Sequence, residues 1–121
     1  MKKVLLVEDV EDNRELVRLL LESQGHIVID AFDGQMAVNM AIEHLPHLVL
    51  MDLSLPGVDG WEAARQLRDD VRTANLPIVA LTAHAMAGDR ERVMAAGFDA
   101  YIAKPIDVST FMGSLARFLA P

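Results

Sequence analysis

The stretch that decides the fold is HLVLMDLSLPG, residues 47–57, in which a short apolar run leads directly into Asp52. An apolar run without alternating polar residues is typical of a β-strand that is buried on both faces. Pro56 and Gly57 then indicate a turn. The stretch therefore predicts that Asp52 lies where a buried strand emerges into a loop.

Other apolar runs also end in polar side chains. They are VLLV (4–7) before Glu8 and Asp9, PIVAL (77–81) before Thr82, and AYIA (100–103) before Lys104 and Pro105. If these strands are parallel, their carboxyl ends meet at one edge of one sheet, which is where ligands bind in open α/β sheets. We therefore expect the carboxylates, a hydroxyl and an ammonium to gather at that edge.

The segments between the apolar runs have helical spacing. They predict helices at residues 11–23, 33–45, 59–71, 86–96 and from Asp107 onward, and a weaker second strand at residues 26–31. Asp33, Asp59 and Asp107 are placed to cap helices. Side chains expected on apolar helix faces are Leu16, Leu19, Leu20, Met36, Met40, Ala41, Val108, Phe111, Met112, Leu115 and Phe118. This alternation predicts an α/β protein with a (βα)5 parallel sheet, covered by helices on both sides.

The composition limits the class of protein. The 121 residues, 52% of them hydrophobic, fit one domain over residues 1–121 with a real core, and we expect no DNA-binding domain beyond it. The formal charge of −7 argues against nucleic-acid and anionic-membrane surfaces. The absence of cysteine excludes disulfides and thiolate metal sites and fits a cytoplasmic location. No apolar stretch approaches the roughly 20 residues of a membrane span.

Carboxylates at the ends of neighbouring strands repel one another by roughly 4 kcal/mol per pair at an effective dielectric near 20. Either one carboxyl keeps a proton or a cation binds, and an oxygen-only site open to water suits Mg²⁺. A carboxylate beside such a cation is a candidate nucleophile toward a phosphoryl group. Lys104 and Thr82 would then contact the phosphoryl oxygens, which is the charge stabilisation that phosphoryl transfer needs.

Each of these residues also has an ordinary structural interpretation, as a loop charge, a turn cap or a helix approach. The methionines fit core packing, and the histidines show no ligand-like grouping. The functional interpretation rests on the coincidence of Glu8-Asp9, Asp52, Thr82 and Lys104-Pro105 at the ends of successive strands.

Taken together, the chain resembles the receiver domain of two-component response regulators over about residues 3–119. The motifs that carry the resemblance are VED (7–9), LMDLSLPGVDG (50–60), LTAHA (81–85) and KPI (104–106). The resemblance implies a flavodoxin-like, doubly wound sheet of five parallel strands in the order 2-1-3-4-5. It also implies a monomer that signals through protein–protein contacts, in a stand-alone regulator or in a hybrid histidine kinase.

The resemblance implies that Asp52 accepts a phosphoryl group from a histidine kinase or a histidine phosphotransfer protein. Asp9, Asp52 and the backbone carbonyl of Ser54 would hold Mg²⁺, or Mn²⁺ in its place, with Glu8 acting mostly through water. The domain would be regulatory, not an enzyme, although it assists its own phosphotransfer and dephosphorylation.

The resemblance also implies a switch. Lys104 would pair with the phosphoryl group and precede a cis Pro105, while Thr82 and Tyr101 would move on phosphorylation. The face formed by residues 86–96, residues 100–103 and the last helix would then change shape for a downstream protein. Residues expected at the docking surface of the phosphohistidine partner are Val10, Asn13, Arg14, Pro105 and Ile106.

Other classes fit less well. An aspartyl-nucleophile phosphatase of the haloacid dehalogenase type needs a second Asp two residues after the first, where this chain has Ser54. A flavin-binding module needs a phosphate cradle in the first loop, which here is the acidic EDVED (8–12). A pseudo-receiver that binds a partner without phosphorylation remains an alternative.

Overall fold

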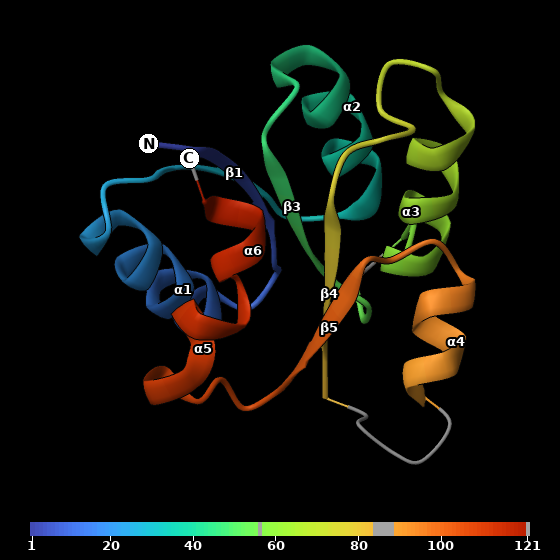
Figure 1. Ribbon diagram of the computed structural model, residues 1–121. Coiled ribbons are helices and arrows are strands. Elements are labelled where there is room, and N and C mark those ends of the chain that lie inside the picture. Colours follow the sequence, from blue (N-terminus) through green and yellow to red (C-terminus); the bar gives the residue numbers. More distant parts are fainter. Residues whose placement is uncertain (56, 84–88, 121) are drawn as a thin grey trace.

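The structure is a computed structural model that describes residues 1–55, 57–83 and 89–120. Its centre is one sheet of five parallel strands in the order β2-β1-β3-β4-β5 (Figure 1). The strands are β1 (Lys3–Val7), β2 (Ile27–Ala31), β3 (Leu48–Asp52), β4 (Ile78–Thr82) and β5 (Ala100–Ala103). The predicted fold class and strand order are therefore confirmed.

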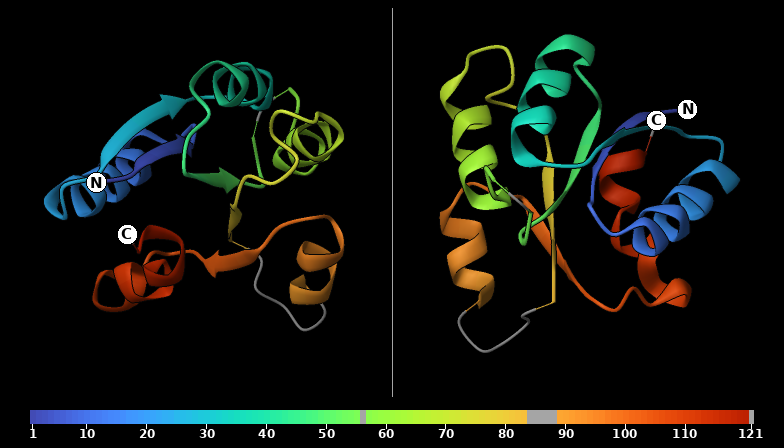
Figure 2. Two further views of the ribbon diagram at one scale, coloured as in Figure 1. Left: turned by 45° about the horizontal axis from the view of Figure 1, so that its top comes forward. Right: turned by 180° about the vertical axis from the view of Figure 1, so that it is seen from behind.

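Helices cover both faces of the sheet (Figure 2). They are α1 (Glu11–Ser23), α2 (Gly34–His44), α3 (Gly60–Asp69), α4 (Asp89–Ala95), α5 (Val108–Ser114) and α6 (Ala116–Leu119). Helices α1, α5 and α6 lie on one side, and α2, α3 and α4 lie on the other. None of the helices within the described ranges has both the length and the apolar character that a membrane crossing requires.

Strands β1, β3 and β4 are nearly continuous apolar runs because each one contributes to two cores. Alternate residues such as Leu5, Val49 and Ile78 pack toward α2, α3 and α4. Their neighbours, such as Leu6 and Leu50, pack toward α1 and α5. Every residue of β3 and β4 is buried, so these two central strands present polar groups only where they end.

The predicted caps form. The carboxylate of Asp33 accepts the backbone N–H of Met36, that of Asp59 accepts from Glu62, and that of Asp107 accepts from Ser109. The Glu62 side chain accepts from Arg65 and Gln66. Asp59 caps the start of α3 immediately after the loop that follows Asp52. The cap therefore fixes where that loop ends.

Two predicted core side chains are exposed. Leu19 is 66% exposed because the buried stripe of α1 runs through Val17 and Leu21, and Leu19 lies about half a turn away. Val108 is 54% exposed in the first turn of α5.

Two helix boundaries also differ from the prediction. The single helix predicted after Asp107 is divided at Leu115, whose N–H donates to Met112, three residues back. Helix α3 ends at Asp69, two residues before the predicted end. The predicted start of the fourth helix at Met86, and the motif residues Pro56, His84 and Ala85, lie outside the described residues.

Candidate functional site

The predicted polar side chains meet at the carboxyl edge of the sheet. Val7 is in register with Met51, and Thr82 is in register with Ala103, so the residues that follow these strands emerge together. Carboxylate oxygens of Glu8, Asp9 and Asp52 all lie within 4.8 Å of one another. The expected gathering of three carboxylates at one edge is thus present.

These side chains differ in exposure. Glu8 and Asp52 are 1% and 4% exposed, whereas Asp9 is exposed to solvent. Thr82, at the end of β4, is also buried. The site therefore has a dry inner wall and an open outer side, through which water, a cation or a phosphoryl donor can reach Asp52.

Lys104 bridges the two buried carboxylates. Its Nζ lies 2.6 Å from Oε1 of Glu8 and 2.8 Å from Oδ2 of Asp52. The backbone N–H of Ser54 donates to Oδ1 of Asp52 at 2.9 Å, and that of Val10 donates to Oε2 of Glu8 at 3.3 Å. One ammonium thus shares its charge between two carboxylates, and each carboxylate also accepts a backbone N–H.

Burial and these contacts shift the pKa values of the two carboxyl groups in opposite directions. Burial, together with its hydrogen bond to Asp52, raises the pKa of Glu8 to about 7. Burial also opposes the charge of Asp52, but hydrogen bonds with Glu8, Lys104 and Ser54 outweigh it and lower the pKa of Asp52. At and below neutral pH, Asp52 is therefore the more fully ionised member of the pair, and a carboxyl group must be ionised to act as a nucleophile.

The donor set fits a hard divalent cation. It consists of carboxylate oxygens, with Asp9 on the open side, and it contains neither sulfur nor imidazole. Such sets suit Mg²⁺ and Mn²⁺ better than softer metals. A raised pKa at Glu8 is also the expected response of crowded carboxylates when a proton takes the place of a cation.

Other predicted site residues surround this cluster. The backbone N–H of Lys104 donates to the carbonyl of Thr82 at 2.7 Å, which joins the ends of β4 and β5. The peptide bond between Lys104 and Pro105 is cis. Ser54 is exposed beside Asp52, whereas Tyr101 lies partly buried on β5, three residues before Lys104.

The residues predicted for partner docking lie around the same edge. Val10 and Pro105 are exposed, whereas Asn13 and Ile106 are half-buried. The guanidinium of Arg14 donates to the backbone carbonyl of Glu8 at 3.0 Å and lies 4.5 Å from the ring centre of Phe32. Phe32 follows β2 and is 46% exposed, and the sequence prediction missed it although an aromatic residue directly after a strand is a usable signal.

Two glycines hold the loop after Asp52 close to the sheet. The sequence motif that ends at Gly60 did not indicate this role, and Gly34 lies in no motif. A Cβ on Gly60 would lie 2.3 Å from the backbone carbonyl oxygen of Asp52. A Cβ on Gly34 would lie 1.9 Å from the carbonyl oxygen of Val58. Both approaches involve backbone, so they require glycine and fix the path of the chain that carries Asp52 and Ser54.

Comparison with known proteins places this geometry in a family. The model of the response regulator receiver domain matches residues 4–116. The polar-differentiation response regulator DivK of Brucella anthropi is 43% identical over 118 residues, which cover 98% of this chain and 96% of that protein. The chain therefore belongs to the response regulator receiver family, and it is a phosphoacceptor signalling switch of two-component systems, similar to DivK.

Solved structures agree. The receiver domain of the sensor histidine kinase PA1611 from Pseudomonas aeruginosa, which holds a magnesium ion in its active-site cleft, has a TM-score of 0.89 and 37% identity, with 99% of this chain and 98% of that chain covered. The chemotaxis response regulator CheY4 of Vibrio cholerae has a TM-score of 0.91 and 28% identity, with 98% and 99% covered. A regulatory role follows from this family, and the relatives named here are bacterial.

Proposed function

We propose that Asp52 is the phosphoacceptor of this switch. Its carboxylate oxygen would attack the phosphorus of a phosphohistidine, the P–N bond would break, and its electron pair would remain on the imidazole. The product is an acyl phosphate on Asp52. The observation that carries this proposal is an ionised, buried carboxylate at a strand end, bonded to Lys104 and within 4.8 Å of Glu8 and Asp9.

The residues that would hold Mg²⁺ are Asp9, Asp52 and the backbone carbonyl of Ser54, with Glu8 acting mostly through water. When bound, the cation neutralises charge on the phosphoryl oxygens, and Mn²⁺ is chemically suited to replace it. The support is the oxygen-only donor set and the magnesium ion in the cleft of the Pseudomonas receiver. The burial of Glu8 and Asp52 keeps the inner side of the site dry, which strengthens these interactions.

The switch would begin at Lys104. In the unphosphorylated state its ammonium bonds to Glu8 and Asp52, and a phosphoryl group on Asp52 would present it with a stronger anionic partner. Thr82, joined to Lys104 through the backbone, would donate its hydroxyl to a phosphoryl oxygen, and Tyr101 would respond on β5. The chain thus assists its own phosphotransfer and dephosphorylation by holding and orienting the phosphoryl group.

The phosphoryl donor is proposed to be a histidine kinase or a histidine phosphotransfer protein. Its docking surface would comprise Val10, Asn13, Arg14, Pro105 and Ile106, which lie around the edge that carries Asp52. The exposed Val10 and Pro105 offer apolar contacts there, and Arg14 is already held in place by Glu8 and Phe32. We also propose that the protein is cytoplasmic and monomeric, and that residues 1–121 act as one receiver unit.

The output would pass through the face formed by α4, β5 and α5 to a downstream protein. Tyr101 lies on β5, which is part of this face, and Lys104 directly follows β5. The face therefore lies next to the proposed switch. This output route is proposed both for a stand-alone receiver and for a receiver within a hybrid histidine kinase.

The decisive measurement is intact mass after incubation with acetyl phosphate. Wild-type protein should gain one phosphoryl group in Mg²⁺ and none in EDTA. Asp52→Asn should gain none, while Asp69→Asn, which removes an exposed carboxylate from α3, should label like wild type. Labelling of Asp52→Asn, or labelling in EDTA, would refute the assignments of acceptor and metal respectively.

A further inference from the structure

Arg14 joins three segments of the chain around the loop that carries Glu8 and Asp9. Its guanidinium donates to the backbone carbonyl of Glu8 at 3.0 Å and lies 4.5 Å from the ring centre of Phe32. The start of α1 is thereby tied to the end of β1 and to the residue that follows β2. We name this set of contacts the Arg14 strap.

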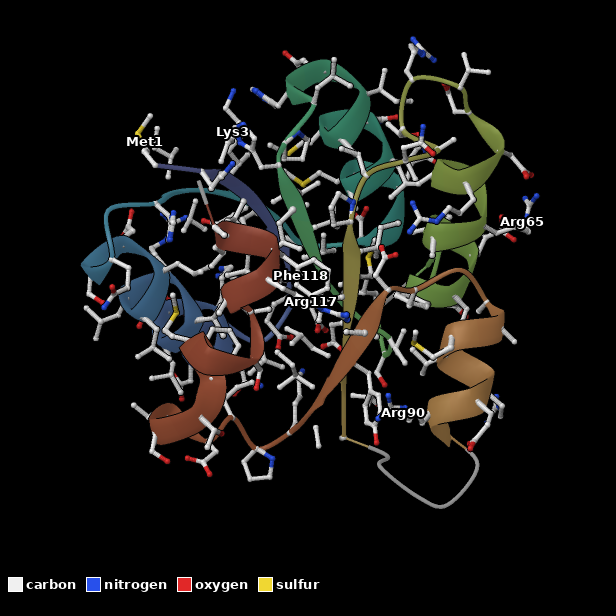
Figure 3. All side chains as sticks on the ribbon, viewed as in Figure 1. Met1, Lys3, Arg65, Arg90, Arg117 and Phe118 are labelled. Atoms are coloured by element: carbon white, nitrogen blue, oxygen red, sulfur yellow. The ribbon has the colours of Figure 1, made fainter. Side chains whose placement is uncertain are left out.

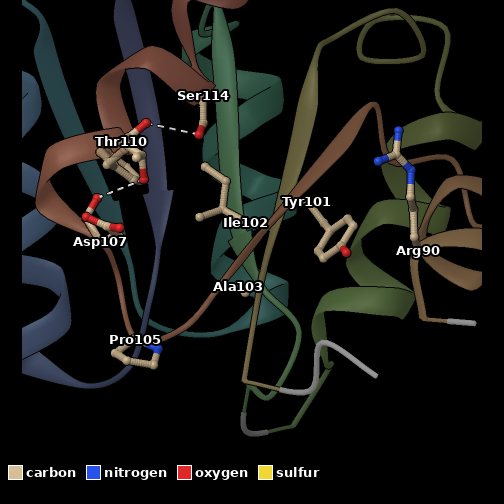
Figure 4. A pocket seen from close by; sticks show the side chains of 9 residues that line it. Arg90, Tyr101, Ile102, Ala103, Pro105, Asp107, Thr110 and Ser114 are labelled. Atoms are coloured by element: carbon tan, nitrogen blue, oxygen red, sulfur yellow. Dashed lines mark hydrogen bonds between the residues drawn. The ribbon is translucent and has the colours of Figure 1, made fainter. Parts of the chain in front are cut away.

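The strap holds the one backbone group of Glu8 that the sheet leaves over. The backbone N–H of Glu8 donates to the carbonyl of Ala31 at 3.1 Å. Its Oε1 lies 2.6 Å from Nζ of Lys104, whose neighbour Pro105 is labelled in Figure 4. Since Arg14 holds the carbonyl, three different segments fix the N–H, the carbonyl and the carboxylate of Glu8.

Fixing the carbonyl of Glu8 also orients Asp9. A peptide unit is planar, so the Glu8 carbonyl and the N–H of Asp9 turn together. Asp9 is exposed, and yet a carboxylate oxygen of it lies within 4.8 Å of those of Glu8 and Asp52. A guanidinium bonded to that carbonyl therefore limits the directions in which the exposed carboxylate can point.

The start of α1 makes such a tie necessary. Aspartate side chains cap α2, α3 and α5. The N-cap of α1 is Val10, which makes no side-chain cap bond. The loop before α1 thus lacks the bond that fixes those three helix starts, and Arg14 supplies a bond to this loop from within the helix.

Phe32 supports the guanidinium rather than the core. Its side chain is 46% exposed, and in the part of the chain that the structure describes it belongs to neither of the two hydrophobic cores. A guanidinium over an aromatic face is attracted by the electrons of the ring. The ring therefore keeps Arg14 in the position from which it reaches Glu8.

We propose that Arg14 is a positioning residue for the cation site, which orients Asp9 through the carbonyl of Glu8 and is itself held by Phe32. This inference rests on the proposed function, because it adds a residue to the site that would hold Mg²⁺. It differs from a docking role for Arg14, since it requires neither a phosphohistidine nor a partner protein.

The test measures Mn²⁺ binding to the full chain from the electron paramagnetic resonance signal of the free ion. Arg14→Met should bind Mn²⁺ roughly tenfold more weakly than wild type, as is usual when a residue that orients a metal ligand is removed. Loss of a positive charge beside a cation site would by itself strengthen binding. A weaker affinity therefore has the sign that positioning predicts and charge alone does not.

Two further variants separate the parts of the strap. Arg14→Lys keeps the charge and one donor but not the planar guanidinium, so its Mn²⁺ affinity should lie between those of wild type and Arg14→Met. Phe32→Leu removes the ring from an exposed position and should weaken binding in the same direction by a smaller factor. Because Phe32 is outside the core, this variant tests the strap even if a change at Arg14 impairs folding.

Arg18→Met is the matched control. Arg18 also joins α1 to β2, through the carboxylate of Asp30 and the carbonyl of Val28, but it lies about one helical turn further from the loop. Its removal takes away the same charge from contacts between the same two elements. It should not weaken Mn²⁺ binding.

A second measurement needs no metal. In EDTA the amide of Val10, which donates to Oε2 of Glu8 at 3.3 Å, should exchange its hydrogen faster in Arg14→Met than in wild type or Arg18→Met, as measured by NMR. Undiminished Mn²⁺ affinity or unchanged Val10 exchange in Arg14→Met would overturn the inference, as would equal losses in Arg18→Met. Wild type that binds Mn²⁺ but takes no label from acetyl phosphate would refute Asp52 as the acceptor and leave the inference intact.

Discussion

The two edges of the sheet use polar side chains in opposite ways. At the amino edge, Nδ1 of His26 accepts the backbone N–H of Lys2 at 3.1 Å, and Nδ1 of His47 accepts that of Lys3 at 2.9 Å. At the carboxyl edge, Glu8 and Asp52 face each other across one ammonium. Figure 3 shows Lys3 at the end of β1 where the chain enters the sheet, and Glu8 follows the other end of the same strand.

The difference teaches where ligand chemistry can arise. Each imidazole at the amino edge meets one backbone donor that would otherwise be left over at the start of β1, so its role is structural. The carboxyl edge concentrates like charges that its own residues satisfy only in part, which raises the pKa of one carboxyl. A bound cation or phosphoryl group would therefore relieve unfavourable electrostatic interactions at the carboxyl edge but not at the amino edge.

The two edges differ most in how closely other backbone atoms approach a glycine. Gly60→Ala should lower the free energy of unfolding by about 3 kcal/mol or more, because the new methyl group would lie 2.3 Å from the Asp52 carbonyl oxygen and 2.8 Å from the Cα of Leu53. Acceptor labelling should fall as well, since the loop after Asp52 must move. Urea unfolding and intact mass measure the two effects.

The control lies at the amino edge, where Gly25 precedes His26. A Cβ on Gly25 has nothing within 4 Å, and the only penalty comes from its φ of +85°. Gly25→Ala should therefore cost about 1 kcal/mol and leave labelling unchanged. Equal losses in the two variants would mean that the carboxyl edge is not the more tightly packed one.

The sequence was sufficient for the fold because local signals agreed with one another. Buried strands, capping aspartates and helical spacing each predicted the same alternation, and the acidic pair, Asp52 and Lys104 fell at strand ends where parallel topology brings them together. The exposed Leu19 shows the limit of this approach, because three leucines at helical spacing do not say which side of the stripe faces the sheet.

Contacts between distant segments could not be read in the same way. Lys104 and Glu8 are 96 residues apart, and their pairing depends on the exact fit of β5 beside β4. The contact of Arg14 with Phe32 joins the start of α1 to the end of β2. Gly34 is required because the carbonyl group of Val58, in another loop, lies against it, and no sequence pattern around Gly34 predicts this contact.

The two edges also differ in whether a lysine ammonium pairs with buried carboxylates. In EDTA at pH 8, Lys104→Met should lower the free energy of unfolding by about 2 kcal/mol, since it leaves two buried carboxylates without their shared cation. Lys3→Met at the amino edge should have little effect, because the bond to His47 uses the backbone N–H of Lys3. Urea titrations give both values, and a larger loss in Lys3→Met would contradict the proposed division between the edges.

The smallest effect is a pH dependence of opposite sign at the two edges, measured in EDTA. The pKa of Glu8 is raised from 4.5 to about 7 in the folded state, so the folded protein binds the extra proton. Its contribution to stability is complete below pH 4.5 and is lost as the pH rises through about 7, on the order of 1–2 kcal/mol. Burial lowers the pKa of His26 below 6.5, so its contribution is present above pH 6.5 and is lost as the pH falls.

These two titrations oppose each other between pH 5 and pH 7, and single substitutions separate them. Glu8→Gln removes the loss on the alkaline side, so stability should rise with pH through this range, driven by His26. His26→Gln keeps an acceptor for the N–H of Lys2 but cannot be protonated, so stability should fall with pH, driven by Glu8. Unfolding free energies at half-unit pH steps decide the matter, because equal slopes in the two variants would show that the edges do not differ in their response to protons.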